Sequence, residues 1–112
     1  MIRRLSPKEE SVMYILWNLK KAFVQDILEE FPEPKPHYNT ISSVVRKLEG
    51  EGLIGHRTYG RSHKYYPVAK KKAYRAALFD HLFKDYFGSK KKFVKYTSEK
   101  LNVSKKDLRK WT

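Results

Sequence analysis

Residues 39–68 read NTISSVVRKLEGEGLIGHRTYGRSHKYYPV, and the apolar spacing changes halfway along this stretch. In the first half, apolar residues recur at intervals of three and four, the spacing of one face of a helix. They are Ile41, Val44, Val45 and Leu48. In the second half, residues 53–59 and 63–68 have the composition of strands around the turn Gly60-Arg61. We therefore expect a helix from Asn39, its N-cap, to Gly50, followed by a β-hairpin.

Two further helical patterns precede this stretch. Ser6-Pro7-Lys8-Glu9 is a strong helix start, because Ser6 can cap, proline suits the first turn and Glu9 completes a capping box. This helix is expected to end near Lys20 or Lys21 and to bury Val12, Met13, Leu16, Trp17 and Leu19. A second helix, marked by Phe23, Ile27, Leu28 and Phe31, is stopped by Pro32. Three helices followed by a hairpin are the order of a winged helix-turn-helix fold.

The remaining residues, 69–112, continue as helices. A long helix is expected from Ala69 to Phe87, ended by Gly88, and Ser89 can cap the next one. Ser104 with Asp107 can start a last short helix that reaches Trp111. The expected fold class is therefore mainly α with a small β-hairpin. A winged-helix DNA-binding domain in residues 1–68 is followed by a C-terminal helical dimerisation region in residues 69–112.

The expected dimerisation region carries more apolar surface than one small winged domain can cover. A second copy of the chain would cover the rest, so we expect a homodimer. The residues expected at the subunit contact are Tyr74, Leu78, Leu82, Phe83, Phe87, Phe93, Val94 and Leu101.

The chain is strongly basic, with a net charge of +13 and a pI near 9.9. Such a balance favours a polyanionic partner, and double-stranded DNA is the first candidate. Residues 69–112 carry +10 of this charge, with 14 Lys and Arg against 4 Asp and Glu. A solvated basic surface, an acidic protein or a membrane would account for the same count.

The polar face of the helix 39–50 lies opposite its apolar stripe and has no acid at its centre. Asparagine can pair with adenine through two hydrogen bonds, and arginine can reach guanine or phosphate. In the hairpin, Arg61 at the turn would meet the DNA backbone or minor groove. The candidate DNA-binding residues are Asn39, Thr40, Ser42, Ser43, Arg46, Lys47, Arg57, Arg61 and Lys64. A solvated polar face and an ordinary turn arginine are the alternatives.

No pattern in the sequence supports catalysis, a cofactor or a metal site. The chain has no cysteine, and His37, His56, His63 and His81 stand without an acid at ligand spacing. We therefore expect a protein that is not an enzyme and binds no cofactor. The N-terminus leads directly into an amphipathic helix, and no apolar run approaches about 18 residues, the length that spans a bilayer. A cytoplasmic location is expected.

These motifs together resemble the penicillinase-repressor family of bacterial regulators. The resemblance rests on Leu5-Ser6-Pro7-x-Glu9-x-x-Val12-Met13-x-x-Leu16-Trp17, on Tyr38-Asn39-Thr40-Ile41 leading to Arg46-x-Leu48, and on Gly60-Arg61 with Tyr65 and Pro67. It implies a homodimeric winged-helix repressor whose C-terminal helices join the subunits on a palindromic operator. It also implies that Thr40 and Ser43 face bases.

Two departures from the family limit what the resemblance implies. Copper-responsive members carry cysteines near the C-terminus, and this chain has none, so metal sensing is not implied. Members that respond to β-lactams are cleaved at an Asn-Phe bond once a membrane-bound sensor protease is activated, whereas here the corresponding place reads Lys95-Tyr96. Such a protease stays a candidate partner. A function from another class also stays open, a winged-helix module that docks protein or RNA without regulating a promoter.

Overall fold

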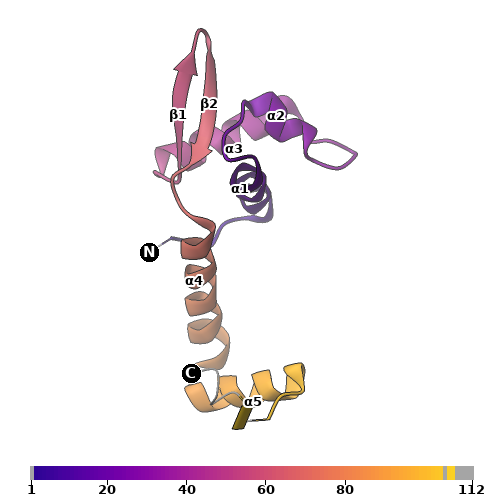
Figure 1. Cartoon of the computed structure of the whole chain (residues 1–112), viewed down its shortest axis with the longest axis vertical. Coiled ribbons are helices and arrows are strands. Elements are labelled where there is room, and N and C mark those ends of the chain that lie inside the picture. Colours follow the sequence, from indigo (N-terminus) through magenta and orange to yellow (C-terminus); the bar gives the residue numbers. More distant parts are fainter. Residues whose placement is uncertain (1, 105, 108–112) are drawn as a thin grey trace. The chain divides into compact units, whose positions relative to one another are not determined.

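The computed structural model describes residues 2–104, 106 and 107. Its elements are α1 (Pro7–Leu19), α2 (Val24–Glu29), α3 (Tyr38–Gly50), β1 (Ile54–Tyr59), β2 (Ser62–Pro67), α4 (Lys71–Leu82), the π-helical turn η1 (Phe83–Phe87) and α5 (Lys90–Leu101) (Figure 1). The chain divides into two compact units, Met1–Arg75 and Ala76–Thr112, and we call the first the winged-helix unit. The predicted fold class, mainly helical with one antiparallel hairpin, is confirmed.

Helix α1 begins with the predicted capping box. The Ser6 hydroxyl accepts a hydrogen bond from the Glu9 amide at 3.3 Å, and the Glu9 carboxylate accepts one from the Ser6 amide at 2.8 Å. The predicted buried face is correct except at its end, because Leu19 is 36% exposed. The helix stops there, and its C-cap Lys20 has a φ of 70°.

The core of the winged-helix unit lies where α1, α2 and α3 meet the hairpin (Figure 1). On the helices the buried side chains recur at helical spacing, so each helix turns one apolar face toward the core, and β1 adds Ile54. The fully buried side chains are Val12, Met13, Leu16, Ile27, Ile41, Val45, Leu48 and Ile54. This core fixes which face of α3 remains exposed.

Tyr74 belongs to this unit, which corrects its predicted place at a subunit contact. The residue is 2% exposed, and its hydroxyl accepts a hydrogen bond from the Leu5 amide at 3.1 Å. The same hydroxyl donates to the Glu10 carboxylate at 2.7 Å. Nearby, the Trp17 indole donates to the Ala69 carbonyl at 2.8 Å. The start of α4 therefore completes the winged-helix unit, which extends to Arg75 rather than ending at residue 68.

Helix α3 starts one residue earlier than predicted, and Asn39 is not its N-cap. His37 holds the cap position with an extended backbone, and its Nδ1 accepts a hydrogen bond from the Asn39 amide at 3.4 Å. Histidine can cap a helix in place of asparagine because an unprotonated ring nitrogen, like the asparagine side-chain oxygen, can accept a hydrogen bond from a backbone amide of the first turn. Asn39 therefore lies within the first turn of α3 and is exposed.

The hairpin has two faces of different character. Strands β1 and β2 pair with Ile54 opposite Pro67 and Tyr59 opposite Ser62, around the turn at Gly60, whose φ is 60°. Side chains alternate between faces along a strand. Ile54, His56, Thr58, His63 and Tyr65 share one face, and Gly55, Arg57, Tyr59, Lys64 and Tyr66 share the other. Ala22 extends the sheet beyond β2 through two hydrogen bonds with Tyr65, of 2.9 and 2.8 Å.

The predicted long helix, which begins in the winged-helix unit and continues past its boundary at Arg75, is interrupted rather than uniform. Helix α4 begins at Lys71, its continuation η1 is a π-helical turn, and Gly88 ends it with a φ of 73°, as predicted. Ser89 caps α5 by accepting from the Lys92 amide at 3.2 Å. The Ser104 hydroxyl accepts from the Asp107 amide at 3.1 Å, whereas Trp111, the predicted end of the last helix, lies outside the described residues.

Within the described residues, no helix is both long and apolar enough to cross a membrane.

Candidate nucleic-acid interface

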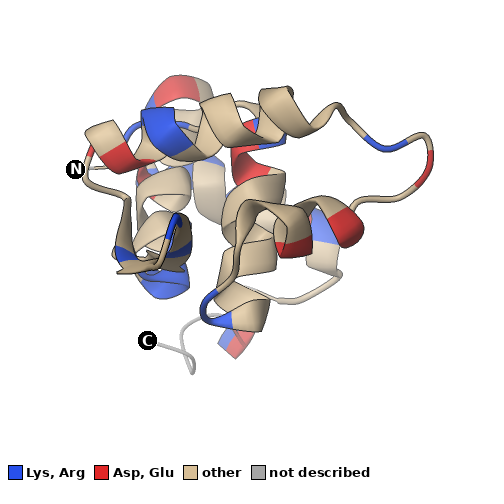
Figure 2. Cartoon of the chain, turned by 90° about the horizontal axis from the view of Figure 1, so that it is seen from above, with Lys and Arg blue, Asp and Glu red and all other residues tan. Residues whose placement is uncertain are grey.

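The exposed face of α3 lies opposite Ile41, Val45 and Leu48. Asn39, Thr40, Ser43 and Arg46 are exposed on this helix, and Ser42 is half-buried. Short polar side chains near the start of a helix allow close approach to another surface. Figure 2 shows Asp and Glu positions interspersed with Lys and Arg positions along the ribbon.

A groove of about 630 Å³ lies between α2, α3 and the hairpin, and we call it the α3 groove. Ser42 and Arg46 line it from α3, and Arg61 and His63 line it from the hairpin. Two predicted DNA-binding arginines, 15 positions apart in the sequence, therefore share one groove. Asp26 also lines it, but this carboxylate accepts a hydrogen bond from the Phe23 amide at the start of α2, at 2.9 Å.

The Arg46 guanidinium makes one long intrahelical hydrogen bond. Its Nε donates to the Ser42 carbonyl at 3.4 Å, and no carboxylate pairs with it among the described residues. An arginine held this loosely keeps both terminal nitrogens for a planar acceptor such as guanine or a phosphate. This geometry fits the role predicted for Arg46.

Lys47 has a partner that the sequence did not indicate. Its Nζ lies 3.2 Å from Oε2 of Glu9, and the Arg3 guanidinium lies 2.6 Å from the same oxygen. Arg3 also pairs with Glu51 at 2.9 Å. We call these four residues the Glu9 cluster. Hydrogen bonds from Arg3, more than any other cause, hold the pKa of Glu9 well below its usual range, and the guanidinium pKa of Arg3 is raised in turn.

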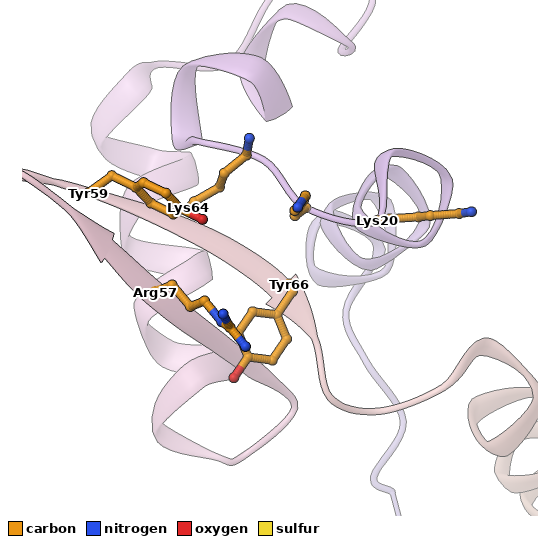
Figure 3. A pocket seen from close by; sticks show the side chains of 6 residues that line it. Lys20, Arg57, Tyr59, Lys64 and Tyr66 are labelled. Atoms are coloured by element: carbon orange, nitrogen blue, oxygen red, sulfur yellow. The ribbon is translucent and has the colours of Figure 1, made fainter.

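The structure separates two predicted DNA-binding residues from the others. Arg57 and Lys64 are direct partners across the strands and lie on the hairpin face that carries Tyr66. The other face, with His63 and Tyr65, borders the α3 groove. Arg57 and Lys64 instead line a second hollow with Lys20, Lys21, Tyr59 and Tyr66 (Figure 3).

Sequence reasoning missed several groove residues. Tyr38 is 45% exposed at the start of α3 and lines the groove, and its place directly before Asn39 was a usable signal. His56 pairs with Glu49 of α3, and the His56 and His63 rings lie 4.3 Å apart. Burial raises the pKa of the Tyr65 phenol at the same groove. These contacts connect the end of α3 to the hairpin.

In the second unit, five aromatic rings form one cluster, with ring centroids 5.2 to 6.5 Å apart along a chain of contacts. We call it the aromatic cluster, and its members are Phe79, Phe83, Phe87, Phe93 and Tyr96. Of the predicted dimerisation residues in this unit, Leu82 is 46% and Leu101 58% exposed. Leu78, Phe83, Phe87, Phe93 and Val94 are half-buried.

Among the described residues, no three His, Asp or Glu side chains gather in a way that could hold a metal ion.

One protein family and several solved structures match the chain. Residues 5–111 match the penicillinase repressor family. No curated protein matches the chain. The complex structure of hsRosR-S4 is similar with a TM-score of 0.58 and 10% identity over 89% of this chain and 90% of that one, which shows a shared fold. A crystal structure of a possible transcriptional regulator for arsenical resistance is 23% identical over 70% of this chain and 86% of that one, with a TM-score of 0.46.

The family match covers the capping box of α1, the exposed face of α3, the hairpin and the described part of the second unit. Together with the winged-helix architecture, it makes the chain a DNA-binding transcriptional regulator rather than an enzyme. The chain belongs to the penicillinase repressor family.

Proposed function

We propose that the chain represses transcription as a homodimer that places α3 in the major groove of an inverted-repeat operator. The observation that carries this proposal is the α3 groove, in which Ser42 and Arg46 of α3 share one concave surface with Arg61 of the hairpin. A helix and a basic hairpin tip on one surface can engage a major groove and the neighbouring backbone at the same time.

Sequence choice would come from the first two turns of α3. Asn39, Thr40 and Ser43 are exposed and short, so their polar atoms can approach base edges closely. Arg46 is one turn beyond Ser42 and would read guanine through both terminal nitrogens. Arg61 would contact phosphate, which adds affinity with little sequence preference.

Lys47 has a different proposed part. Its side chain is 63% exposed although its Nζ pairs with Glu9, so the ammonium can face a phosphate while it keeps the carboxylate contact. The pairing restrains Lys47 before DNA binds, which lowers the entropy lost on binding.

The dimer would form through the second unit. Leu82 and Leu101 are exposed apolar residues there, and Phe79 and Tyr96 of the aromatic cluster are each 49% exposed. Burying such surface against a second copy removes apolar area from water. The lysines of this unit would then face outward, where salt screens them or DNA phosphates neutralise them.

The proposed inducing partner is a membrane-bound sensor protease. To act as it does on β-lactam-responsive members, it would have to cleave this chain within α5. Lys95-Tyr96, which stands where β-lactam-responsive members have Asn-Phe, lies inside this helix. The Tyr96 ring is 5.2 Å from the Phe87 ring, so cleavage there would remove part of the aromatic cluster. Separation of the two subunits would then release the operator.

The test is binding of the full chain to genomic fragments, followed by anisotropy titration on the duplex so identified. An inverted repeat bound specifically in excess competitor DNA, with a steep salt dependence, supports the proposal. Each phosphate neutralised should add a slope of about −0.9 to the plot of log affinity against log salt. Equal affinity for random duplexes would refute it and favour a module that docks protein or RNA.

A further inference from the structure

The second hollow of the winged-helix unit lies on the hairpin face turned away from the α3 groove (Figure 3). Its volume is about 390 Å³, and we call it the hairpin pocket. Four of its six lining residues are cations, two are tyrosines, and none is a carboxylate. They are Lys20, Lys21, Arg57, Tyr59, Lys64 and Tyr66. None of these six residues lines the α3 groove.

The charges of the hairpin pocket are not neutralised by the described part of the chain. Arg57 and Lys64 are direct partners across the strands, a placement of like charges that destabilises a hairpin unless an anion compensates it. No ion pair involves either residue, or Lys20 or Lys21, among the described residues. Lys64 only packs its ammonium 5.3 Å from the Phe23 ring centroid. The pocket therefore holds a net positive potential.

Both tyrosine rings are positioned by their neighbours. Tyr66 is 38% exposed and lies against Gly55, its partner across the strands. A Cβ at position 55 would come within 2.7 Å of the Tyr66 ring, so a glycine there is what lets the ring lie over β1. Tyr59 is 50% exposed, and its ring lies roughly perpendicular to the Phe23 ring. Both tyrosines are thus partly exposed and line the same hollow as the four cations.

The two lysines that line the pocket from outside the hairpin follow directly after α1, where the backbone is unfavourable. Lys20 has a φ of 70° at a C-cap position where glycine is the common residue. Strained residues of this kind persist where the surrounding structure or a function requires them. In Figure 3 the Lys20 chain extends away from the strands, at the rim of the pocket. Lys21 follows it directly, before the Ala22 bridge to β2.

We propose that the hairpin pocket binds a small aromatic compound that carries phosphate groups, of the size of a nucleotide. Arg57, Lys64 and Lys21 would bind the phosphates through charged hydrogen bonds. Tyr66 and Tyr59 would stack on the ring system. A hollow of about 390 Å³ falls within the range of small-ligand sites. Duplex DNA fits less well, because the α3 groove and Arg61 lie toward the opposite hairpin face.

The experiment is calorimetric titration of the full chain with ATP, GTP and UTP, and in parallel with inorganic triphosphate and adenosine. At least one nucleotide should bind more tightly than triphosphate and adenosine alone. Arg57→Gln with Lys64→Gln should weaken that binding by about tenfold, because the double variant removes charged hydrogen bonds to the phosphates. The control removes the same charge elsewhere, with Lys8→Gln and Lys90→Gln, and should leave the affinity unchanged.

Two further variants separate ring stacking from folding effects. Tyr66→Leu should weaken the nucleotide but not triphosphate, because it removes only the stacking surface. Lys21→Gln tests the phosphate contact from outside the hairpin, and circular dichroism checks that each variant is folded.

Three results would overturn the proposal. The first is an equal loss in the control variant, which would indicate general attraction to a chain of charge +13. The second is that inorganic triphosphate binds as tightly as each of the three nucleotides. The third is a loss of duplex affinity in the Arg57 and Lys64 variant with nucleotide affinity unchanged, which would assign the pocket to DNA.

Discussion

The Nζ of Lys47 lies 3.2 Å from the Glu9 carboxylate, so an ion pair ties α3 to the first turn of α1. The same carboxylate caps α1 and binds Arg3. One buried acid therefore fixes the N-terminal segment, α1 and α3 relative to each other.

Replacing Glu9 with Gln should lower the free energy of unfolding by roughly 1–3 kcal/mol, because the amide can still cap α1 but removes the charge that pairs with Lys47 and leaves Arg3 with Glu51 alone. Thermal or urea unfolding measures it. Glu30→Gln, at an exposed position after α2, is the matched control and should change little.

The pH dependence of this variant follows from the same carboxylate. The pKa of Glu9 is lower in the folded chain than its ordinary value of 4.5, so Glu9 stabilises the fold above that pH. Its contribution is lost as the pH falls from 4.5 toward the folded pKa. Wild type should lose stability in this window faster than Glu9→Gln, and parallel curves would contradict the assignment.

Arg46→Ala should weaken specific operator binding by on the order of 1–3 kcal/mol and leave random duplexes less affected, because we propose that its guanidinium reads a base. Anisotropy titration at fixed salt measures both affinities. Lys8→Ala, which removes an exposed charge from the start of α1, is the control. Equal losses on both duplexes would place Arg46 on phosphate instead.

Arg61→Ala should lower affinity to a similar degree for specific and random duplexes, since the proposed contact of the hairpin tip is with the DNA backbone. It should also reduce the salt slope by about 0.9 for each phosphate that the variant no longer neutralises. A changed base preference would show that the tip reads sequence.

A chain ending at Arg75 should be a folded monomer with weak DNA binding, whereas the full chain should sediment as a dimer. A chain ending at Val68 should be less stable than the Arg75 version. It lacks the Tyr74 hydroxyl that joins Leu5 to Glu10 and the Ala69 carbonyl that accepts from Trp17. A full chain that stays monomeric while binding an inverted repeat tightly would refute the dimer.

Local spacing predicted the elements well, because capping boxes, helical stripes and turn residues act over a few positions. Ser6 with Glu9, the α3 stripe and the Gly60 turn are all confirmed. The pairing of Arg3 with Glu51, 48 positions apart, leaves no local trace. The prediction that Tyr74 lies at a subunit contact was wrong, because a run of aromatic residues at helical spacing does not indicate which part of the protein packs against each ring.

The sequence predicts which hairpin residues share a face, but not which face borders α3. Alternation from the apolar Ile54 puts His56 and Thr58 on the core side and Arg57 on the other. Grouping Arg57 and Lys64 with Arg61 by charge alone ignored this alternation. Which face borders α3 required the packing of Ile54 into the core.

The bridge between Ala22 and Tyr65 has a mechanical consequence. Two backbone hydrogen bonds anchor the middle of β2 to the segment after α1, whereas near the tip the Tyr59 ring reaches beyond the hairpin through its looser contact with the Phe23 ring. The hairpin should therefore be rigid near Tyr65 and increasingly mobile toward the turn at Gly60. Amide hydrogen exchange should be slow at Tyr65 and Ala22 and accelerate toward Tyr59. In the proposed complex, such a gradient would let Arg61 follow the curvature of a duplex while α3 stays in register.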